Sequence, residues 1–582
     1  MATMYFRPAA GNWSAAGTWS NSSGGASNGL VPDATTDCIL DAGSGANTLT
    51  INGTSGSPNL CRSLVCTGFT GTLGHASAKQ LNIGDGTAGA FTLVSGMTYN
   101  PAGDSLLKFV STTTGNNITF GSKSMGNMTF DGVGGTWTFQ SAPATGNATT
   151  ITLTNGNLNV NGNNLNTYII SSSNSNTRSL TMGTMTWTVG SGNSGTFWEM
   201  SNSSGMTLSA ANCTQTISTT STNITLNLGG LTYGTLQQTA LTTGTTTING
   251  ANTFGTLTLS MAGTTKTTLS GYSLGGNQTV TGTFTAAGNS AILRNYIRSD
   301  TIGTPRTISA GTFTVTHTDL RDITKAGAGS GDFSALTTNA NGDAGGNTGF
   351  TFTAPKNCYL KVNANANWSA SNWYTTSGGS TAIVPAVPLI HDTAIIDANA
   401  SFSTSRTITN SDQPRMPAMN WTGAPNTPAF ASGSSAWEHY GSMTLISGMT
   451  HTGSGTMSFC GRGAFTLDGG GLTWPTSSAI TVNCASGNSL SLGSNFASNS
   501  TISVTSGNFK NLSYTGSFTG ITVNGGTLTL GSSGLTTSGA QVLAQSGTIS
   551  GNGYYVTTST GQITFAGAAA GAACNPLGGY IG

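Results

Sequence analysis

The stretch ITLTNGNLNVNGNNL, residues 151–165, decides the fold because large apolar side chains recur at every second position, apart from short breaks of Asn and Gly. Such alternation places one row of side chains inward and one outward on a β-strand. Helical periodicity is nearly absent, so the sequence predicts an all-β protein. The same pattern, with Thr dominating the outward row, recurs in SLTMGTMTWTVG (179–190), ITLNLGGLTYGTL (224–236), TTTINGANTFGTLTL (245–259) and ITVNGGTLTLGSSGL (521–535).

The spacing of these strings distinguishes between β architectures. They recur about every 8 to 12 residues, which suits a sandwich, a barrel or a solenoid. A sandwich closes its core after about 100 residues, whereas here one pattern continues far longer. Self-similar short strands indicate stacked coils, each burying its inner face against the next. We expect a right-handed parallel β-helix (β-solenoid) rich in Gly, Thr, Ser and Asn, in two tandem modules. Serial β-sandwiches are the alternative.

The composition excludes several classes of protein. Only 6% of the 582 residues are charged and the formal net charge is +1, against roughly 25% charged residues in an average soluble protein. No basic stripe indicates nucleic acid, and no basic amphipathic segment indicates a membrane surface. Disorder is disfavoured because the hydrophobic residues are ordered in alternating strings. No phosphate loop or nucleophile elbow stands out from the glycine-rich background, so no cofactor is expected.

Targeting and metal-binding signals are also missing from the sequence. The first residues, MATMYFRPAAGNWS, lack the apolar core of a secretory signal, and no apolar run approaches the ~20 residues of a membrane span. The five histidines show no paired ligand spacing, so no metal is expected. The cysteines are too widely spread for a disulfide framework, and buried free thiols are predicted for Cys38, Cys61, Cys66, Cys213, Cys358, Cys460, Cys484 and Cys574.

Charged residues are rare between Arg178 and Arg294, return from Arg294 onward and are frequent in the segment that begins at residue 315. The segment VTHTDLRDITKAGAGSGDF (315–333) is followed by a glycine-rich segment (339–357). We expect this charged boundary segment, 315–350, to close a first β-helical module of residues 1–350. Residues 351–582 are expected to form a second, shorter β-helical module.

A motif with two tryptophans occurs twice in the sequence. GNWSAAGTWS (11–20) returns as ANWSASNWYT (366–375), VPDATTDCILDA (31–42) as VPLIHDTAIIDA (387–398), and FTLVSGMTY (91–99) as MTLISGMTH (443–451). The matches keep one order, which indicates an internal duplication. Each tryptophan pair precedes the first Asp-bounded strand of its module, where it can cover the open end of a solenoid, and the recurring aspartates favour turn capping. Two caps, at 1–42 and 366–398, are expected from Trp13, Trp19, Pro32, Asp37, Asp41, Trp368, Trp373, Pro388, Asp392 and Asp397.

These motifs resemble a family of virion proteins of tailed bacteriophages, which are tail-fibre- or tailspike-like and β-helical. The likeness rests on the NWS..W and VP..D modules, on LRDITKAG with GDAGGNTGFTFTAP, and on MPAMNWTGAPNTPAF with YGSMTLISGM. It implies a virion surface protein, made in the host cytoplasm without a signal peptide. It further implies a homotrimer that contacts other virion proteins and host surface polysaccharide, with neither nucleic-acid binding nor membrane insertion.

Some bacteriophage β-helices cleave polysaccharide, which requires two carboxyl groups about 5–9.5 Å apart, one with a raised pKa. The acids of the boundary segment are the alternative catalytic set: Asp319, Asp322, Asp332 and Asp343. Asp319 and Asp322 are three apart, so on a strand they would point to opposite faces. Surface ion pairing or capping of the solenoid end is the favoured role, and no catalytic residue is assigned.

Two aromatic–carboxylate pairs are candidate ligand-binding elements. They are Trp198 with Glu199 and Trp437 with Glu438. An aromatic ring beside a carboxylate is a usual sugar-binding element, although an isolated pair is more often part of a core. The sequence thus favours a non-enzymatic virion structural protein that presents a rigid neutral surface to host-envelope glycans. The alternatives are a polysaccharide-depolymerising tailspike and a capsid decoration or head-fibre protein without a receptor role.

Overall fold

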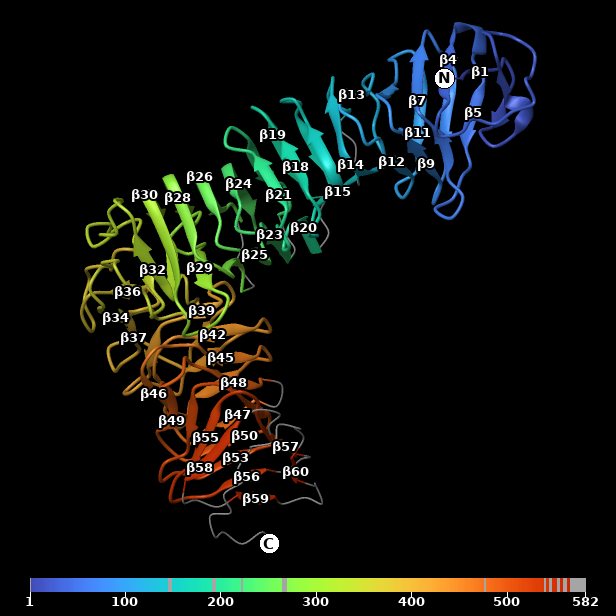
Figure 1. Cartoon of the computed structure of the whole chain (residues 1–582). Helices are drawn as coiled ribbons and strands as arrows, with labels where there is room; N and C mark the ends of the chain where they lie inside the picture. The colour runs from blue at the N-terminus through green and yellow to red at the C-terminus, as the bar shows by residue number, and fades with distance from the viewer. Residues whose placement is uncertain are drawn as a thin grey trace.

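Two stacks of parallel coils make up the computed structural model, which describes residues 2–144, 149–190, 195–220, 223–263, 269–475, 478–537, 541–543, 547–551, 555–557 and 563–565. Strands account for 48% and helices for 1%, and the coils form a β-solenoid of about 21 turns (Figure 1). The predicted parallel β-helix is confirmed. The alternative of serial β-sandwiches is wrong, because strands pair in parallel with the equivalent strand of the next coil.

The stretch that decides the fold lies mostly in β15 (Thr150–Asn159). Its apolar side chains are at most 4% exposed, so the alternation has its predicted meaning. Gly156 lies within β15 with a φ of 74°, and a Cβ atom there would lie 2.2 Å from a carbonyl oxygen of the preceding coil. Glycine bends the strand at this corner. The first half of β15 therefore pairs with β17 (Ile169–Ser171) and the second half with β18 (Arg178–Thr181).

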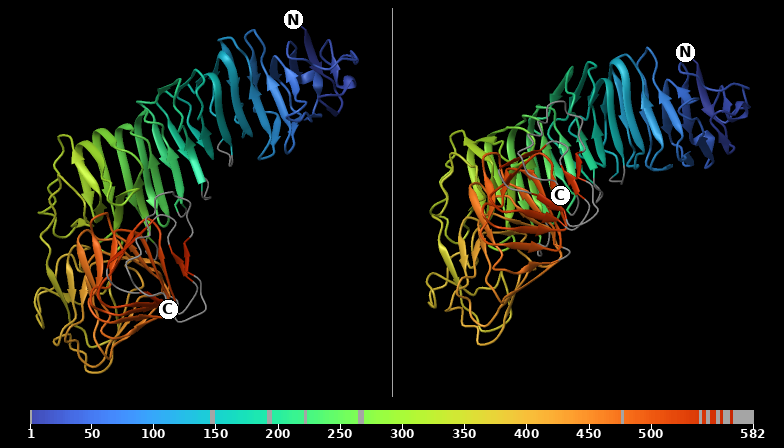
Figure 2. Two further views of the ribbon diagram at one scale, coloured as in Figure 1. Left: turned by 60° about the horizontal axis from the view of Figure 1, so that its bottom comes forward. Right: turned by 90° about the horizontal axis from the view of Figure 1, so that it is seen from below.

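The first module has one hydrophobic core that runs from Met4 to Phe333. Its coils contribute to a 21-stranded sheet, a 4-stranded sheet near the N-terminus and an 8-stranded sheet. The views in Figure 2 show these coils as one long stack. The 8-stranded sheet consists of β16 (Leu165–Thr167), β19 (Thr186–Val189), β22 (Thr214–Ile217), β24 (Thr232–Leu241), β26 (Thr253–Met261), β28 (Gln278–Ala287), β30 (Arg306–Thr316) and β32 (Ile323–Ala326).

The second module has a separate core, from Cys358 to Leu535, and none of the described strands pairs across the two modules. Its axis turns away from that of the first module, so the chain is sharply bent (Figure 1). One of its faces is a 6-stranded sheet of β39 (Arg415–Met416), β42 (Trp437–His439), β45 (Met457–Phe459), β48 (Ile480–Asn483), β51 (Thr501–Ser506) and β54 (Gly520–Val523).

Both tryptophan pairs lie in the first coil of their module and have one geometry. The indole Nε1 of Trp19 donates to the carbonyl oxygen of Trp13 at 2.8 Å, and that of Trp373 donates to Trp368 at 2.9 Å. The ring centroids are 5.0 Å apart in the first pair and 4.8 Å in the second. All four side chains are buried. This is the burial that a cap over the end of each core requires.

The remaining cap residues bring one correction to the alignment of the two halves. Asp41 accepts from the backbone N–H of Ser44 at the start of η2 (Ala42–Ser44), and Asp397 accepts from that of Asn399, so both cap turns. Pro32 and Pro388 are buried before the strands that follow.

Asp37 and Asp392, however, are not equivalent. Asp37 pairs with Thr3 in the register of β1 (Thr3–Phe6), whereas Thr393 pairs with Asn357 in the corresponding place. Asp37 forms an ion pair with Arg62. Asp392 instead takes the position of Thr36: it accepts from the N–H of Leu389 at 2.8 Å, as Thr36 accepts from that of Asp33. The loop before the strand differs in register by one residue between the two modules, and aligning the two sequences by identical residues does not reveal this difference.

A column of aromatic rings runs along the core of the second module. His451 stacks on Phe430 with a centroid distance of 5.6 Å and lies 4.1 Å from Trp474. Burial lowers the pKa of His451 to about 4, and does the same for His439. Both imidazoles are therefore neutral parts of the core at pH 7.

Stability of the second module is expected to fall as the pH drops from 6.5 towards 4. The unfolded chain takes up protons on both histidines near pH 6.5, whereas the folded chain does so only near pH 4. Each histidine then contributes a slope of at most about 1.4 kcal/mol per pH unit. Replacing His451 with phenylalanine, which keeps the aromatic column, is expected to reduce the slope by up to about 1.4 kcal/mol per pH unit in denaturant titrations at pH 6.5 to 5.

Phe518→Leu is the matched control, since Phe518 continues the same column through Phe496 and its ring contacts involve no histidine. It is expected to lower stability equally at each pH and to leave the slope unchanged. An unchanged slope in His451→Phe would contradict the assignment.

Candidate functional site

The two modules meet through the outer faces of two sheets, at a contact called the junction below. In the first module it involves β27 (Gly271–Leu274), β29 (Asn295–Ser299) and β31 (Thr318–Arg321), and in the second module β39, β42 and β45. Strands β27, β31 and β42 are buried at every residue, whereas β19 and β22 bury only alternate residues. The second module therefore covers the outer face of the first at this end.

Tyr296 and Arg415 lie at the centre of the junction. The hydroxyl of Tyr296 is hydrogen-bonded to that of Tyr440 across the two modules. The guanidinium of Arg415 lies 3.7 Å from the centroid of the Tyr296 ring, donates to the carbonyl oxygen of Ser270 at 3.1 Å and pairs with Glu438 at 3.1 Å. A cation on an aromatic face is worth about 2 kcal/mol or more when it is desolvated.

The alternative catalytic aspartates do not converge on a cleft. Asp319 is buried in an ion pair with Arg294, and Asp322 is buried between Arg321 and Arg462 of the second module. Asp322 follows β31 with a φ of 57°, so strand alternation does not govern its direction. The surface ion pairs expected from the sequence are instead buried.

The other two aspartates cap turns. Exposed Asp332 accepts from the N–H and the hydroxyl of Ser334, and Asp343 accepts from the N–H of Gly345 at 2.8 Å. The N–H of Asp343 in turn donates to Nδ1 of His391, which ties the junction to the second cap. None of the four has the surroundings of a reacting carboxylate.

Glu438 is a further buried carboxylate of the junction, besides Asp322, and its charge state decides whether it could act as a general acid. Burial alone would raise the pKa of Glu438, but Arg415, together with Arg298 and Arg321, outweighs burial and holds that pKa below its usual value. Glycosidic cleavage needs a general acid with a raised pKa. Glu438 is therefore an ionised partner of arginines, and its environment does not suit proton donation.

The predicted aromatic platforms are also enclosed. Trp437 packs edge-on against Phe430 and His439, and Trp198 packs against Trp187 and Tyr233. Both indoles are 1% exposed, so neither offers a face to a sugar ring.

Glu199, by contrast, reaches the surface. It accepts from the N–H and hydroxyl of Ser201 and from the amide of Asn227, whose own oxygen accepts from Asn249 at 2.7 Å. Burial would raise the pKa of Glu199, but these hydrogen bonds outweigh it and hold the pKa below the usual value. A hollow of about 350 Å³ lies beside Asn227 and Asn249, and Gly229 and Gly250 also line it.

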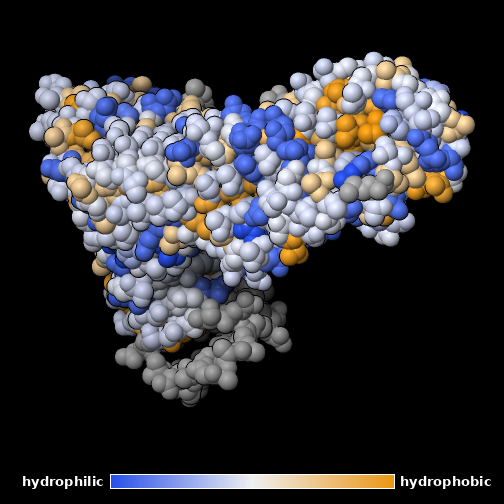
Figure 3. All heavy atoms as spheres, turned by 45° about the horizontal axis from the view of Figure 1, so that its top comes forward, coloured by the Kyte–Doolittle hydropathy of each residue, from blue (hydrophilic) through white to orange (hydrophobic). Residues whose placement is uncertain are grey.

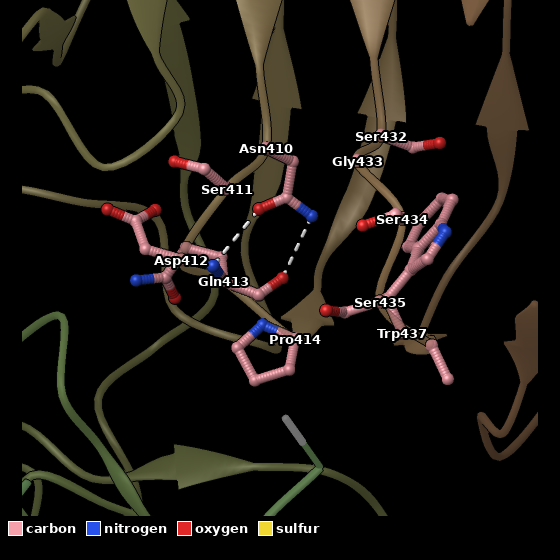
Figure 4. A pocket seen from close by; sticks show the side chains of 11 residues that line it. Asn410, Ser411, Asp412, Gln413, Pro414, Ser432, Gly433, Ser434, Ser435 and Trp437 are labelled. Atoms are coloured by element: carbon pink, nitrogen blue, oxygen red, sulfur yellow. Dashed lines mark hydrogen bonds between the residues drawn. The ribbon is translucent and has the colours of Figure 1, made fainter. Parts of the chain in front are cut away.

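A second hollow, of about 180 Å³, lies beside the junction in the second module (Figure 4). The hydroxyls of Ser434 and Ser435 point towards Asn410 and Gln413 of the preceding coil. Asn410 is already bonded to the backbone of Gln413, which is tied in turn to Ile292 of the first module. Both hollows fall near or below the lower end of the roughly 300–1,000 Å³ usual for ligand pockets.

These hollows were not identified from sequence, because Ser, Asn and Gly runs occur at many corners of the chain. The described residues contain no group of three or more side chains suited to a metal ion, and no helix among them is both long and apolar enough to cross a membrane. The seven described cysteines are buried and free, and Cys574 lies outside the described residues. No family model, no curated protein and no solved structure matches the chain.

Proposed function

We propose that the chain is a non-enzymatic structural protein of a bacteriophage virion, tail-fibre- or spike-like, that presents a rigid neutral surface to glycans of the host envelope. The observation that carries the proposal is the junction. Buried Glu438 pairs there with Arg298 of the first module, and buried Asp322 pairs with Arg462 of the second. These ion pairs occupy both carboxylates and join the two solenoids. This arrangement suits a stiff spacer more than a catalyst.

The outer surface supports attachment through many weak contacts. Figure 3 shows one face with mixed polar and apolar patches, and the chain carries only 35 charged groups, from 18 basic and 17 acidic residues. Large exposed hydrophobic side chains such as Leu30, Val133 and Leu512 are scattered along the described chain. Hydroxyl and amide groups therefore supply most of the contacts proposed for a glycan.

The proposed assembly is a homotrimer on the virion surface, in contact with other virion proteins and host surface polysaccharide. Light scattering of the purified chain is expected to give three times the protomer mass. Labelled-antibody microscopy on virions is expected to place it on the tail. A label on the head without retention on host polysaccharide would support a decoration or head-fibre protein and overturn the receptor role.

Incubation with host surface polysaccharide separates attachment from cleavage. We expect the chain to be retained on immobilised polysaccharide while the number of reducing ends stays constant. The appearance of new reducing ends would overturn the non-enzymatic proposal. If Glu199→Gln abolishes them and Glu438→Gln does not, the depolymerase site lies at Glu199, beside Asn227.

A further inference from the structure

The 8-stranded sheet of the first module carries two columns of mostly threonine on its outer face. We call the residues at these positions on β19, β22, β24, β26, β28 and β30 the threonine face. In chain order they are Thr186 and Thr188, Thr214 and Thr216, Thr235 and Gln237, Thr256 and Thr258, Thr283 and Thr285, and Thr312 and Thr314.

The columns are held in register by the backbone. Thr188 pairs with Thr216, the next strand contributes Gln237, and Thr258, Thr285 and Thr314 continue the column. The other column is continuous from Thr186 to Thr256 and resumes from Thr283 to Thr312, with a register shift on its N-terminal side.

The side chains of the threonine face are held in place by the buried residues on the inner side of the same strands. A buried side chain such as Trp187, Leu257 or Phe284 lies between the two outward residues on five of the six strands and fixes the strand on the core, and on β30 the intervening Phe313 is partly buried. Threonine is β-branched and stiff at χ1. Its hydroxyl and methyl groups therefore repeat in fixed positions with little rotational freedom left to lose on binding.

The hydroxyls are available to a ligand. Among the twelve positions, the only side-chain hydrogen bond runs from the amide of Gln237 to Thr216, at 3.1 Å. The second module covers the other long sheet, at β27, β29 and β31, and leaves these strands half-exposed. Between Arg178 and Arg294 the sequence contains only two charged residues, Glu199 and Lys266.

The spacing of the face identifies its partner. Neighbouring strands lie about 4.7–4.9 Å apart, and alternate residues along one strand lie about 6.6 Å apart. A ligand that matches both spacings at once needs a two-dimensional repeat of this size, as the surface of an ordered solid has. On the prism faces of ordinary ice, one repeat of the oxygen atoms is close to the strand spacing and the other is somewhat longer than the distance between alternate residues. These oxygen atoms accept and donate hydrogen bonds as threonine hydroxyls do.

The geometry points to ice as a ligand of the threonine face. Hydroxyls would take the places of surface water molecules, while the methyl groups between them would exclude loosely held water. Each contact is weak, but all are presented at once on one rigid sheet, so their effects combine without a further loss of freedom. The inference does not depend on the proposed role in a virion.

Slow growth of ice from a dilute solution of the full chain tests the inference. The wild-type protein is expected to enter the ice at a higher concentration than an inert globular protein. Thr258→Tyr, which places a large ring in the middle of the face, is expected to lower the ice-bound fraction about tenfold. Thr258→Val keeps the methyl packing and is expected to give a smaller loss.

Thr152→Tyr is the matched control, since Thr152 is a half-buried outward threonine on β15 of the other long sheet. It is expected to enter ice as the wild type does, and the circular dichroism melts of all variants establish that they are folded. Exclusion of the wild type from ice, or equal losses in Thr258→Tyr and Thr152→Tyr, would overturn the inference. Retention on crystalline cellulose with exclusion from ice would assign the face to a polysaccharide.

Discussion

Replacing Arg415 with alanine is expected to lower the free energy of unfolding of the second module by about 3–5 kcal/mol, the usual loss when one partner of a buried ion pair is removed. The substitution leaves Glu438 buried beside one cation fewer and removes the group that lies on Tyr296. Denaturant titrations followed by tryptophan fluorescence measure the loss. Small-angle X-ray scattering is expected to show that the two modules separate.

Arg406→Ala is the matched control for this substitution. Arg406 lies in the same module and bonds only to Asn363 and Ser403 at the surface. Surface changes of this kind alter stability by about 0.5 kcal/mol or less. If Arg415→Ala leaves both the titration and the scattering curve unchanged, the junction does not hold the modules together.

Trp19→Ala and Trp373→Ala are expected to lower the stability of the first coil of their own module only, each by about 3–5 kcal/mol. Each substitution removes a buried ring and its hydrogen bond to the preceding tryptophan. Hydrogen exchange measures the effect locally. Trp19→Ala is expected to remove protection from β1 and leave β34 (Asn357–Leu360) protected, while Trp373→Ala does the reverse.

Val133→Ala serves as the control for the cap substitutions, because Val133 is 68% exposed and its removal leaves no cavity. It is expected to leave exchange unchanged in both caps. Equal loss of protection in both modules from a single tryptophan substitution would show that the caps are not independent units.

The fold could be predicted from local sequence because each coil is formed by a short run of consecutive residues. Alternation in residues 151–165 sets which side chains enter the core, and the buried set is the one that the alternation selects. The duplicated tryptophans were informative for the same reason, since the two members of each pair lie within one coil and bond to each other. The error of one residue at Asp392 arose where a loop changed length without changing the strand that follows.

The junction could not be predicted, because it depends on how two finished solenoids meet. The strand TDLR of β31 has nothing in its own sequence to indicate that its outer face is covered. Glu438 was noticed for its neighbour Trp437, although its partners, Arg298 and Arg415, lie elsewhere in the chain. The available signal was the return of arginine and aspartate after a nearly uncharged stretch, which marked the place but not the partner.

Because of the position of the junction, the length of the second module does not depend on the angle between the two modules. Among the described residues, the hydrogen bonds and ion pairs with the first module come from the early coils of the second, up to Arg462, and Ala485, just after β48, lies near Gly303. The described strands beyond that point pair only with strands of their own module. Whole coils there can be gained or lost without altering the angle, so length and direction can evolve as independent traits.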